Sequence, residues 1–149
     1  MATNSKAPRA QRQGTPIALI YDRLTLPGTT LLTERLRECE RYASEFEWDF
    51  RGLWIEHGPQ ALTADDRPQL GALLHIMRAH SASRPVVCLV YDWDRLGSAE
   101  SRPVLQRRVR MAGGWVETAQ GESDRAVRFG HLHEAPQSLG AASAVSPPS

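Results

Sequence analysis

Hydrophobic and polar residues follow two different patterns along residues 16–119 of the chain. Continuous apolar runs such as 86–91 (VVCLVY) are typical of strands that are buried on both faces. Elsewhere apolar residues recur at helical spacing, as on the buried side of an amphipathic helix. These patterns predict strands at 17–21, 48–56, 86–91 and 115–118 and helices at 30–46, 68–80 and 99–112.

The alternation of strands and helices predicts the fold class. It indicates an α/β protein, a three-layer αβα domain with a mainly parallel central sheet of about four strands. Residues 1–15 are small and polar and are expected to form a disordered arm. The α/β domain would cover 16–119, and a short C-terminal extension would follow at 120–149, loose from about residue 140. That extension is too short for a further domain.

Composition narrows the possible functions only a little. The chain has 149 residues and a formal net charge of +1, so no large global charge points to nucleic acid. Of its 18 basic residues all but Lys6 are arginine, the better ligand for phosphate oxygens. The bias of a GC-rich genome towards arginine codons is the alternative explanation of this excess.

The cysteines and the apolar segments suggest a cytoplasmic protein. Cys39 and Cys88 have no CxxC spacing and lie on apolar faces of predicted elements, as expected of reduced, buried thiols. A membrane-spanning helix needs about 18 consecutive apolar residues, and no stretch of the chain approaches that length. The N-terminus lacks the apolar core of a signal peptide. His131 and His133 match no zinc spacing, so we expect neither a metal nor a cofactor.

Arginines follow the predicted strands at the end where α/β proteins bind their ligands. Arg23 comes just after the first strand, Arg67 lies in the loop after the second, and Arg95 follows the third. Three loops therefore deliver three arginines to one side of the sheet. Guanidinium groups match phosphate oxygens with paired hydrogen bonds, and a nearby hydroxyl such as that of Thr25 could be a nucleophile.

A purely structural explanation of these arginines is also open. Each has an aspartate beside it, and a salt bridge between the two neighbours would cap the strand end without any ligand. The pairs are Asp22–Arg23, Asp66–Arg67 and Asp94–Arg95. Asp65 or Asp66 would in addition be the N-cap of the helix at 68–80, whose first turn suits Pro68.

Three short motifs contain the arginines and stand in order along the chain. They are Tyr21-x-Arg23-x-Thr25, Asp66-Arg67-Pro68 before an apolar helix, and Asp94-Arg95-Leu96-Gly97. Over about residues 16–119 this order and the strand–helix alternation resemble the catalytic domain of the serine recombinases, the resolvase/invertase family. That family carries Y-x-R-x-S, then D-R or similar before a helix, then D-R-L-[SG]-R.

The resemblance implies a function and a role for each matched residue. Members of the family cleave and exchange DNA strands site-specifically through a phosphoserine link, without a metal or an energy cofactor. The residues that match arginines binding the scissile phosphate are Arg23, Arg67 and Arg95. Asp94 matches an acidic residue of the same cluster, and Thr25 stands at the place of the serine nucleophile. Tyr21 and Arg102 are further candidates for contacts with phosphate or DNA.

The chain departs from the family pattern at the residues that carry the chemistry. Thr25 keeps a hydroxyl but is β-branched, so its methyl group crowds an attack. Ser98 stands where the third motif ends in arginine, and Arg102 lies one helical turn further on. Glu34 lies about where the family tends to have glutamine, and a carboxylate there would repel phosphate. We expect no counterpart of the family's dimer helix and DNA-binding region after the fourth predicted strand.

Two other features adjoin the third motif. Trp93 lies within the loop itself. A basic face runs along the helix at 99–112, for which a solvated surface is the simplest explanation. Its members are Arg102, Arg107, Arg108 and Arg110.

Three functions remain open at this point. The first is a degenerate, non-catalytic recombinase-like domain, an accessory protein or a remnant of a mobile element. The second is an active DNA strand-transfer enzyme that uses Thr25, with a partner recombinase or a homodimer supplying DNA binding. The third is a regulatory or protein-interaction α/β module that has kept only the fold. None of the three involves a membrane.

Overall fold

The computed structural model describes residues 14–25, 30–58, 61, 63 and 66–125. Its strands are β1 (Ile17–Leu24), β2 (Asp49–His57), β3 (Val86–Val90) and β4 (Trp115–Thr118). Its helices are α2 (Thr30–Glu45), α3 (Pro68–Ser81), α4 (Trp93–Leu96) and α5 (Arg102–Met111). The strands and the three long helices agree with those expected from the hydrophobic pattern.

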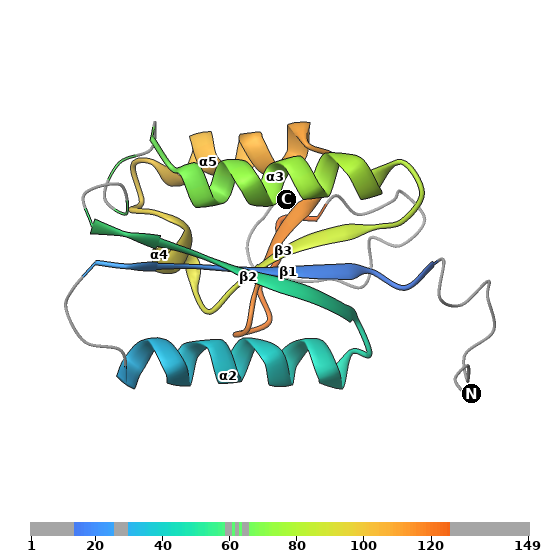
Figure 1. The fold of residues 1–149 in the computed structure, drawn as a ribbon, viewed down its shortest axis with the longest axis horizontal. Helices are drawn as coiled ribbons and strands as arrows, with labels where there is room; N and C mark the ends of the chain where they lie inside the picture. Colours follow the sequence, from blue (N-terminus) through green and yellow to red (C-terminus); the bar gives the residue numbers. More distant parts are fainter. Residues whose placement is uncertain (1–13, 26–29, 59–60, 62, 64–65, 126–149) are drawn as a thin grey trace, which may run out of the picture.

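The strands form one parallel sheet between two layers of helices. Their order is β2-β1-β3-β4, so that β1 and β3 are central. Figure 1 shows α2 against one face of the sheet and α3 and α5 against the other. The predicted three-layer α/β fold is therefore confirmed. The central strands are buried on both faces, which explains why they read as continuous apolar runs.

β1 and β2 extend further than β3 at their carboxyl ends. β1 pairs with β2 as far as Leu24 and His57, whereas β3 pairs with β1 only as far as Leu89, opposite Ile20. The last residues of β1 therefore run past the end of β3, and α4 packs beside them. This arrangement brings the end of β1 and the turn after β3 to one place on the carboxyl edge of the sheet.

The segment after β3 differs from the prediction. The sequence predicted a loop there and a helix from residue 99, whereas α4 forms at once and α5 begins at Arg102. Asp92 is the N-cap of α4, since its carboxylate accepts a bond from the Arg95 amide at 3.2 Å. Gly97 allows α4 to pack against α5, because a Cβ there would lie only 2.6 Å from Leu105 Cδ1.

Two apolar clusters, one on each face of the sheet, make the core. The cluster beneath α3 and α5 contains Cys88, and the cluster beneath α2 contains Cys39. Both thiols are free and buried, and burial raises the pKa of Cys39 to about 12. The cysteines are therefore small apolar core residues, as their positions in the sequence indicated.

After β4 the chain turns back along the outer edge of that strand. Asp124 N donates to Val116 O at 3.0 Å, and Thr118 N donates to Glu122 O at 2.7 Å. The Asp124 carboxylate also accepts the Val116 amide at 2.8 Å, which secures this hairpin. Among the described residues, no helix has the length and apolar character needed to cross a bilayer.

Candidate functional site

Arg23 lies near the end of β1 and connects three segments of the chain. Its Nε donates to Asp94 O at 2.7 Å and its Nη1 donates to Ala61 O at 2.7 Å. The side chain is thus held between α4 and the segment that follows β2. Arg23 makes no ion pair with a carboxylate among the described residues.

Arg67 stands immediately before α3 and is almost completely buried, with 2% of its surface exposed. Its Nη1 donates to Leu96 O at 2.5 Å and to Tyr21 Oη at 3.0 Å, while its Nε donates to Thr63 O. Its Nη2 is buried and has no hydrogen-bond partner in the described part of the chain. A buried charged donor without a partner is costly, so this group is available to an acceptor.

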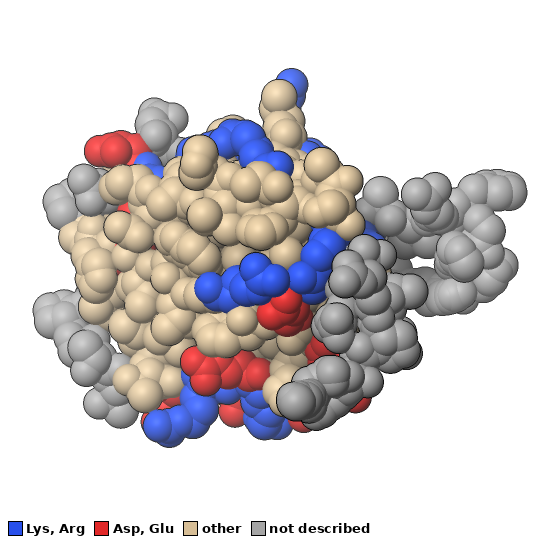
Figure 2. Space-filling model, turned by 45° about the vertical axis from the view of Figure 1, so that its right-hand side comes forward, with Lys and Arg blue, Asp and Glu red and all other residues tan. Residues whose placement is uncertain are grey.

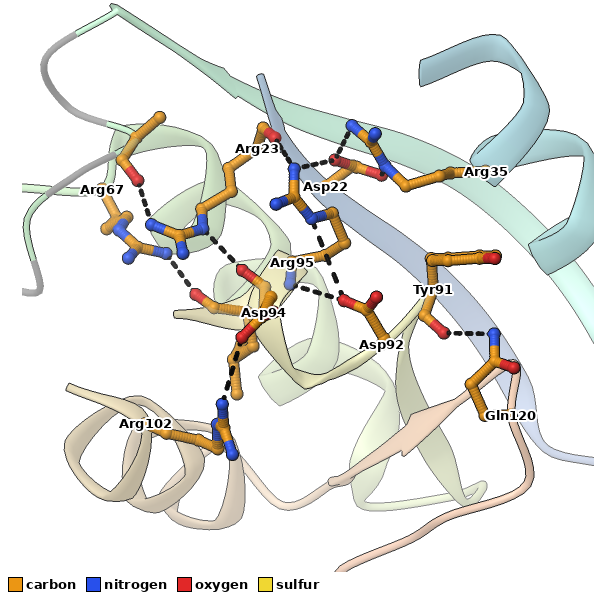
Figure 3. Close-up of polar contacts among 12 residues, drawn as sticks. Asp22, Arg23, Arg35, Arg67, Tyr91, Asp92, Asp94, Arg95, Arg102 and Gln120 are labelled. Carbon is orange, nitrogen blue, oxygen red and sulfur yellow. Dashed lines mark hydrogen bonds and ion pairs between the residues drawn. The ribbon is translucent and has the colours of Figure 1, made fainter. Parts of the chain in front are cut away.

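Arg95 belongs to α4 and contacts residues near the end of β1. Its Nη1 donates to Arg23 O at 2.9 Å and lies 3.9 Å from Asp22 Oδ1. Its Nε lies 3.9 Å from Asp92 Oδ1. The carboxylates beside Arg95 are therefore those of Asp22 and Asp92, and not that of its neighbour Asp94 (Figure 3).

The structure brings the three predicted arginines into one cluster. Burial, together with the positive charges of Arg67 and Arg95, lowers the pKa of Arg23. The hydrogen bonds place the three side chains together, since Arg23 and Arg67 both donate to carbonyls of α4 and Arg95 donates to the carbonyl of Arg23. The alternative in which each arginine pairs with its neighbouring aspartate is not what the described residues show. Asp22 binds Arg35 and Asp94 approaches Arg102.

Tyr21 and Glu56 form a buried support beneath Arg67. Tyr21 Oη donates to Glu56 Oε2 at 3.1 Å and accepts the bond from Arg67. Burial raises the pKa of the Tyr21 hydroxyl, which therefore stays protonated. Tyr21 is thus placed to orient Arg67.

Glu56 also caps the first turn of α3. Its carboxylate accepts the amides of Gln69 at 3.0 Å and Leu70 at 2.9 Å. The N-cap role expected for Asp66 is not seen, and Asp65 lies outside the described residues. Sequence analysis missed Glu56, although strand periodicity places it on the same face as Trp54, which packs against the core.

Arg35 is a second residue near the site that sequence analysis missed. It reaches from α2 to the buried Asp22 with two hydrogen bonds of 2.8 and 2.9 Å. This partner raises the pKa of Arg35. Glu34, which was expected to oppose phosphate, is exposed. The helical spacing of Arg35 from the buried Leu32 and Cys39 is the signal that could have identified it.

The remaining candidates are less completely placed. Thr25 follows β1 directly and is partly buried, while residues 26–29 lie outside the described part of the chain. Ser98 is exposed, and its hydroxyl lies 3.1 Å from that of Ser101. His131 and His133 lie outside the described part of the chain, and within that part no three metal-binding side chains cluster.

The fold of this chain, a parallel α/β sheet between layers of helices, is that of the serine recombinase catalytic domains. The N-terminal catalytic domain of TP901-1 integrase superposes with a TM-score of 0.55 at 19% identity, over 70% of this chain and 77% of that one. The C-terminal catalytic domain of ISC1926 TnpA, an IS607-like serine recombinase, gives 0.55 at 20% identity, over 71% and 69%.

A resolvase family site-specific recombinase from Streptococcus pneumoniae has the same fold, with a TM-score of 0.57 at 11% identity over 74% of this chain and 76% of that one. No protein-family model matches the chain, and no curated protein matches it in sequence. At such low identities the similarity establishes the fold. The resemblance seen in the three motifs is consistent with it.

Proposed function

We propose that this protein binds the phosphodiester backbone of DNA at its arginine cluster, as a recombinase-like domain that does not cleave the strand. The observation that carries the proposal is the convergence of Arg23, Arg67 and Arg95 from three separate segments. Within the described residues, two of the three, Arg23 and Arg67, have no carboxylate partner. Such a cluster lowers its own electrostatic energy by binding an anion.

A phosphate group suits the donors of the cluster. Arginine donors lie in a fixed plane that matches two oxygens of one phosphate group. The cluster lies at the carboxyl edge of the sheet, where α/β proteins generally place their ligands. The fold, shared with proteins named as recombinases and an integrase, favours a phosphate that belongs to DNA.

The absence of cleavage is proposed from the residues at two positions. Thr25 carries a methyl group on the atom that bears its hydroxyl, and this restricts the rotamer from which it could attack. Misplacement of a nucleophile by a small distance lowers the rate by about 10²-fold. Ser98 is uncharged where the resemblance expects an arginine, and the loss of one charged donor lowers catalysis by roughly 10²- to 10³-fold.

Binding to a fluorescein-labelled DNA duplex at several salt concentrations tests the proposal. Arg95→Ala should weaken binding about tenfold at low salt and reduce the salt dependence by about one phosphate contact. Arg37→Ala is the matched control, because Arg37 is an exposed arginine on α2, and it should bind as the wild type does. If the wild type does not bind DNA, or if both variants bind equally, the cluster is structural and the protein is better described as an interaction module.

A further inference from the structure

Arg102, the first residue of α5, lies beside α4 at the rim of the arginine cluster. Its guanidinium carbon is 5.9 Å from the centre of the Trp93 ring, in the range of a cation–π interaction. Its Nη2 lies 3.4 Å from Asp94 Oδ1. The side chain is 26% exposed, so one part of it is fixed against α4 and another part faces solvent.

The hydrogen bonding of Arg102 is incomplete. Its Nε is buried and has no partner among the described residues. The contact to Asp94 is longer than the about 2.7–2.9 Å of a strong charge-assisted bond. The Asp94 side chain is 72% exposed, so it is free to move away. Arg35, by contrast, forms two short bonds to a buried carboxylate and has little to offer a ligand.

Arg102 and Arg23 meet at the same residue. Arg23 donates to the backbone oxygen of Asp94, and Arg102 approaches its carboxylate from the other side (Figure 3). The two arginines thus approach one residue from opposite sides. An anion that takes the place of the Asp94 carboxylate would contact Arg102 and extend the cluster formed by Arg23, Arg67 and Arg95.

We infer that Arg102 is a fourth phosphate-binding arginine, oriented by the face of Trp93 and covered by Asp94 until a DNA phosphate displaces that carboxylate. The inference rests on the proposed function and assigns a ligand to an arginine that lies outside the three matched motifs. Trp93 acts as a positioning residue, since its ring sets the direction of the guanidinium plane. Asp94 competes with the phosphate for Arg102.

The salt dependence of DNA binding by the full chain tests this inference. Arg102→Gln should remove one phosphate contact, so the loss of affinity between about 50 and 200 mM salt should shrink about threefold relative to the wild type. Arg107→Gln, on the exposed side of the same helix, should leave that dependence unchanged. Ser98→Arg in the Arg102→Gln background should restore it. Equal effects of Arg102→Gln and Arg107→Gln would overturn the inference in favour of a diffuse basic surface.

A double-mutant cycle adds a readout that a structural role would not move. Asp94→Asn should strengthen DNA binding, and this gain should be several-fold smaller when Arg102→Gln is also present. Trp93→Leu should lower the affinity towards that of Arg102→Gln. If the gain from Asp94→Asn is the same in both backgrounds, Asp94 does not cover Arg102 and the inference is wrong.

The experiment separates this inference from the function on which it rests. Binding that depends on Arg95 but not on Arg102 overturns the fourth arginine and leaves the proposed function standing. A wild-type chain that binds no DNA, with the Arg102 Nε–H NMR signal unmoved by inorganic phosphate, overturns both. Circular dichroism and thermal unfolding of each variant show whether it is folded.

Discussion

Arginines near the carboxyl edge of the sheet differ in the kind of group to which they donate hydrogen bonds. Arg35 meets a carboxylate in two hydrogen bonds and is neutralised by it. Arg23 and Arg67 meet backbone carbonyls and a hydroxyl, which hold their positions without cancelling their charge. Positive charge is therefore retained on residues that are fixed in place. Such preorganised charge is what binding a phosphate requires.

Glu56 does not belong to the proposed phosphate-binding residues, but its substitution should disturb the arginine cluster more than that of any other supporting residue. It is 0% exposed and accepts three hydrogen bonds, from Tyr21 and from the first turn of α3. Glu56→Ala should lower the free energy of unfolding by about 3 kcal/mol, because three donors lose their acceptor and two of these bonds, from Tyr21 and Leu70, are buried. Urea denaturation measures this change.

Glu45→Ala is the control for Glu56→Ala. Glu45 is an exposed residue of α2 that faces Arg41 at 3.7 Å, and its removal should cost well under about 1 kcal/mol. A loss for Glu56→Ala no larger than that of the control would show that the α3 amides find other acceptors. In that case Glu56 would not be the support of Arg67.

Individual elements owe their final positions to side chains that come from other elements. β1 continues through charged residues because α2 and α4 supply partners for Asp22 and Arg23. α3 begins where Glu56 of β2 meets its amides. At the far edge, β4 is covered by its own hairpin, in which Asp124 bonds to Val116 and to Gln106 of α5.

The stability of that hairpin should depend on pH through Asp124. Burial raises the pKa of Asp124 in the folded state, although hydrogen bonds from Val116 and Gln106 oppose the effect. A raised pKa means that the protonated form is favoured by folding, so this contribution is present at low pH and is lost as pH rises through the folded pKa. Asp124→Asn should therefore be at least as stable as the wild type at pH 7.

Urea denaturation at a series of pH values measures the sign of this effect on stability. The stability difference between Asp124→Asn and the wild type should shrink as pH falls from 7 towards 4, because the wild-type carboxyl becomes neutral as well. An Asn variant that is less stable at pH 7, with the difference vanishing in acid, would mean that the ionised carboxylate is the stabilising form. That result would contradict the raised pKa.

In the molecule as a whole, charged side chains pair at both ends of the sheet, and the arginine cluster lies at the carboxyl edge. Both faces of the sheet are closed by helices, and the described polar network of β1, α3 and α4 lies at the carboxyl edge (Figures 1 and 3). In the space-filling view of Figure 2, basic side chains on one face lie next to acidic ones. This mixed surface is in keeping with the small net charge of +1. The proposed binding of DNA would therefore depend on the local arginine cluster and not on the overall charge of the protein.

Strand cleavage by residues at the carboxyl edge of the sheet can be tested on supercoiled DNA. The wild-type chain should form no covalent adduct that survives denaturation. Thr25→Ser combined with Ser98→Arg should raise adduct formation or nicking by at least about 10²-fold, because it supplies an unhindered nucleophile and a further charged donor. The matched control, Thr25→Ala with Ser98→Arg, should remain inactive.

Either of two results would change the proposal that the protein binds DNA without cleaving it. A phosphothreonine adduct at Thr25 in the wild type would make the protein an active strand-transfer enzyme. A folded double variant that binds DNA but never forms an adduct would show that the arginines bind phosphate without aligning it for attack. Mass spectrometry of the denatured complex distinguishes these cases.

The fold class and the main elements could be read from residue order, since they depend on local periodicity. The apolar run at 86–91 identified a central strand, and the spacing of apolar residues identified α2, α3 and most of α5. The convergence of Arg23, Arg67 and Arg95 at one edge followed from a general rule, that carboxyl ends of parallel strands share an edge. Local pattern and topology were sufficient for these.

The order of residues in the sequence did not predict which partner each charged group binds. Adjacent Asp–Arg pairs suggested local salt bridges, yet Asp22 binds Arg35 of α2 and Asp94 turns to Arg102 of α5. Neighbouring residues of a strand, such as Asp22 and Arg23, point to opposite faces, and neighbouring residues of a helix, such as Asp94 and Arg95, do not face each other. A pair that is adjacent in sequence is therefore separated in space. Which distant residue then meets each one depends on how helices pack across the sheet. That packing follows from burial summed over the whole core.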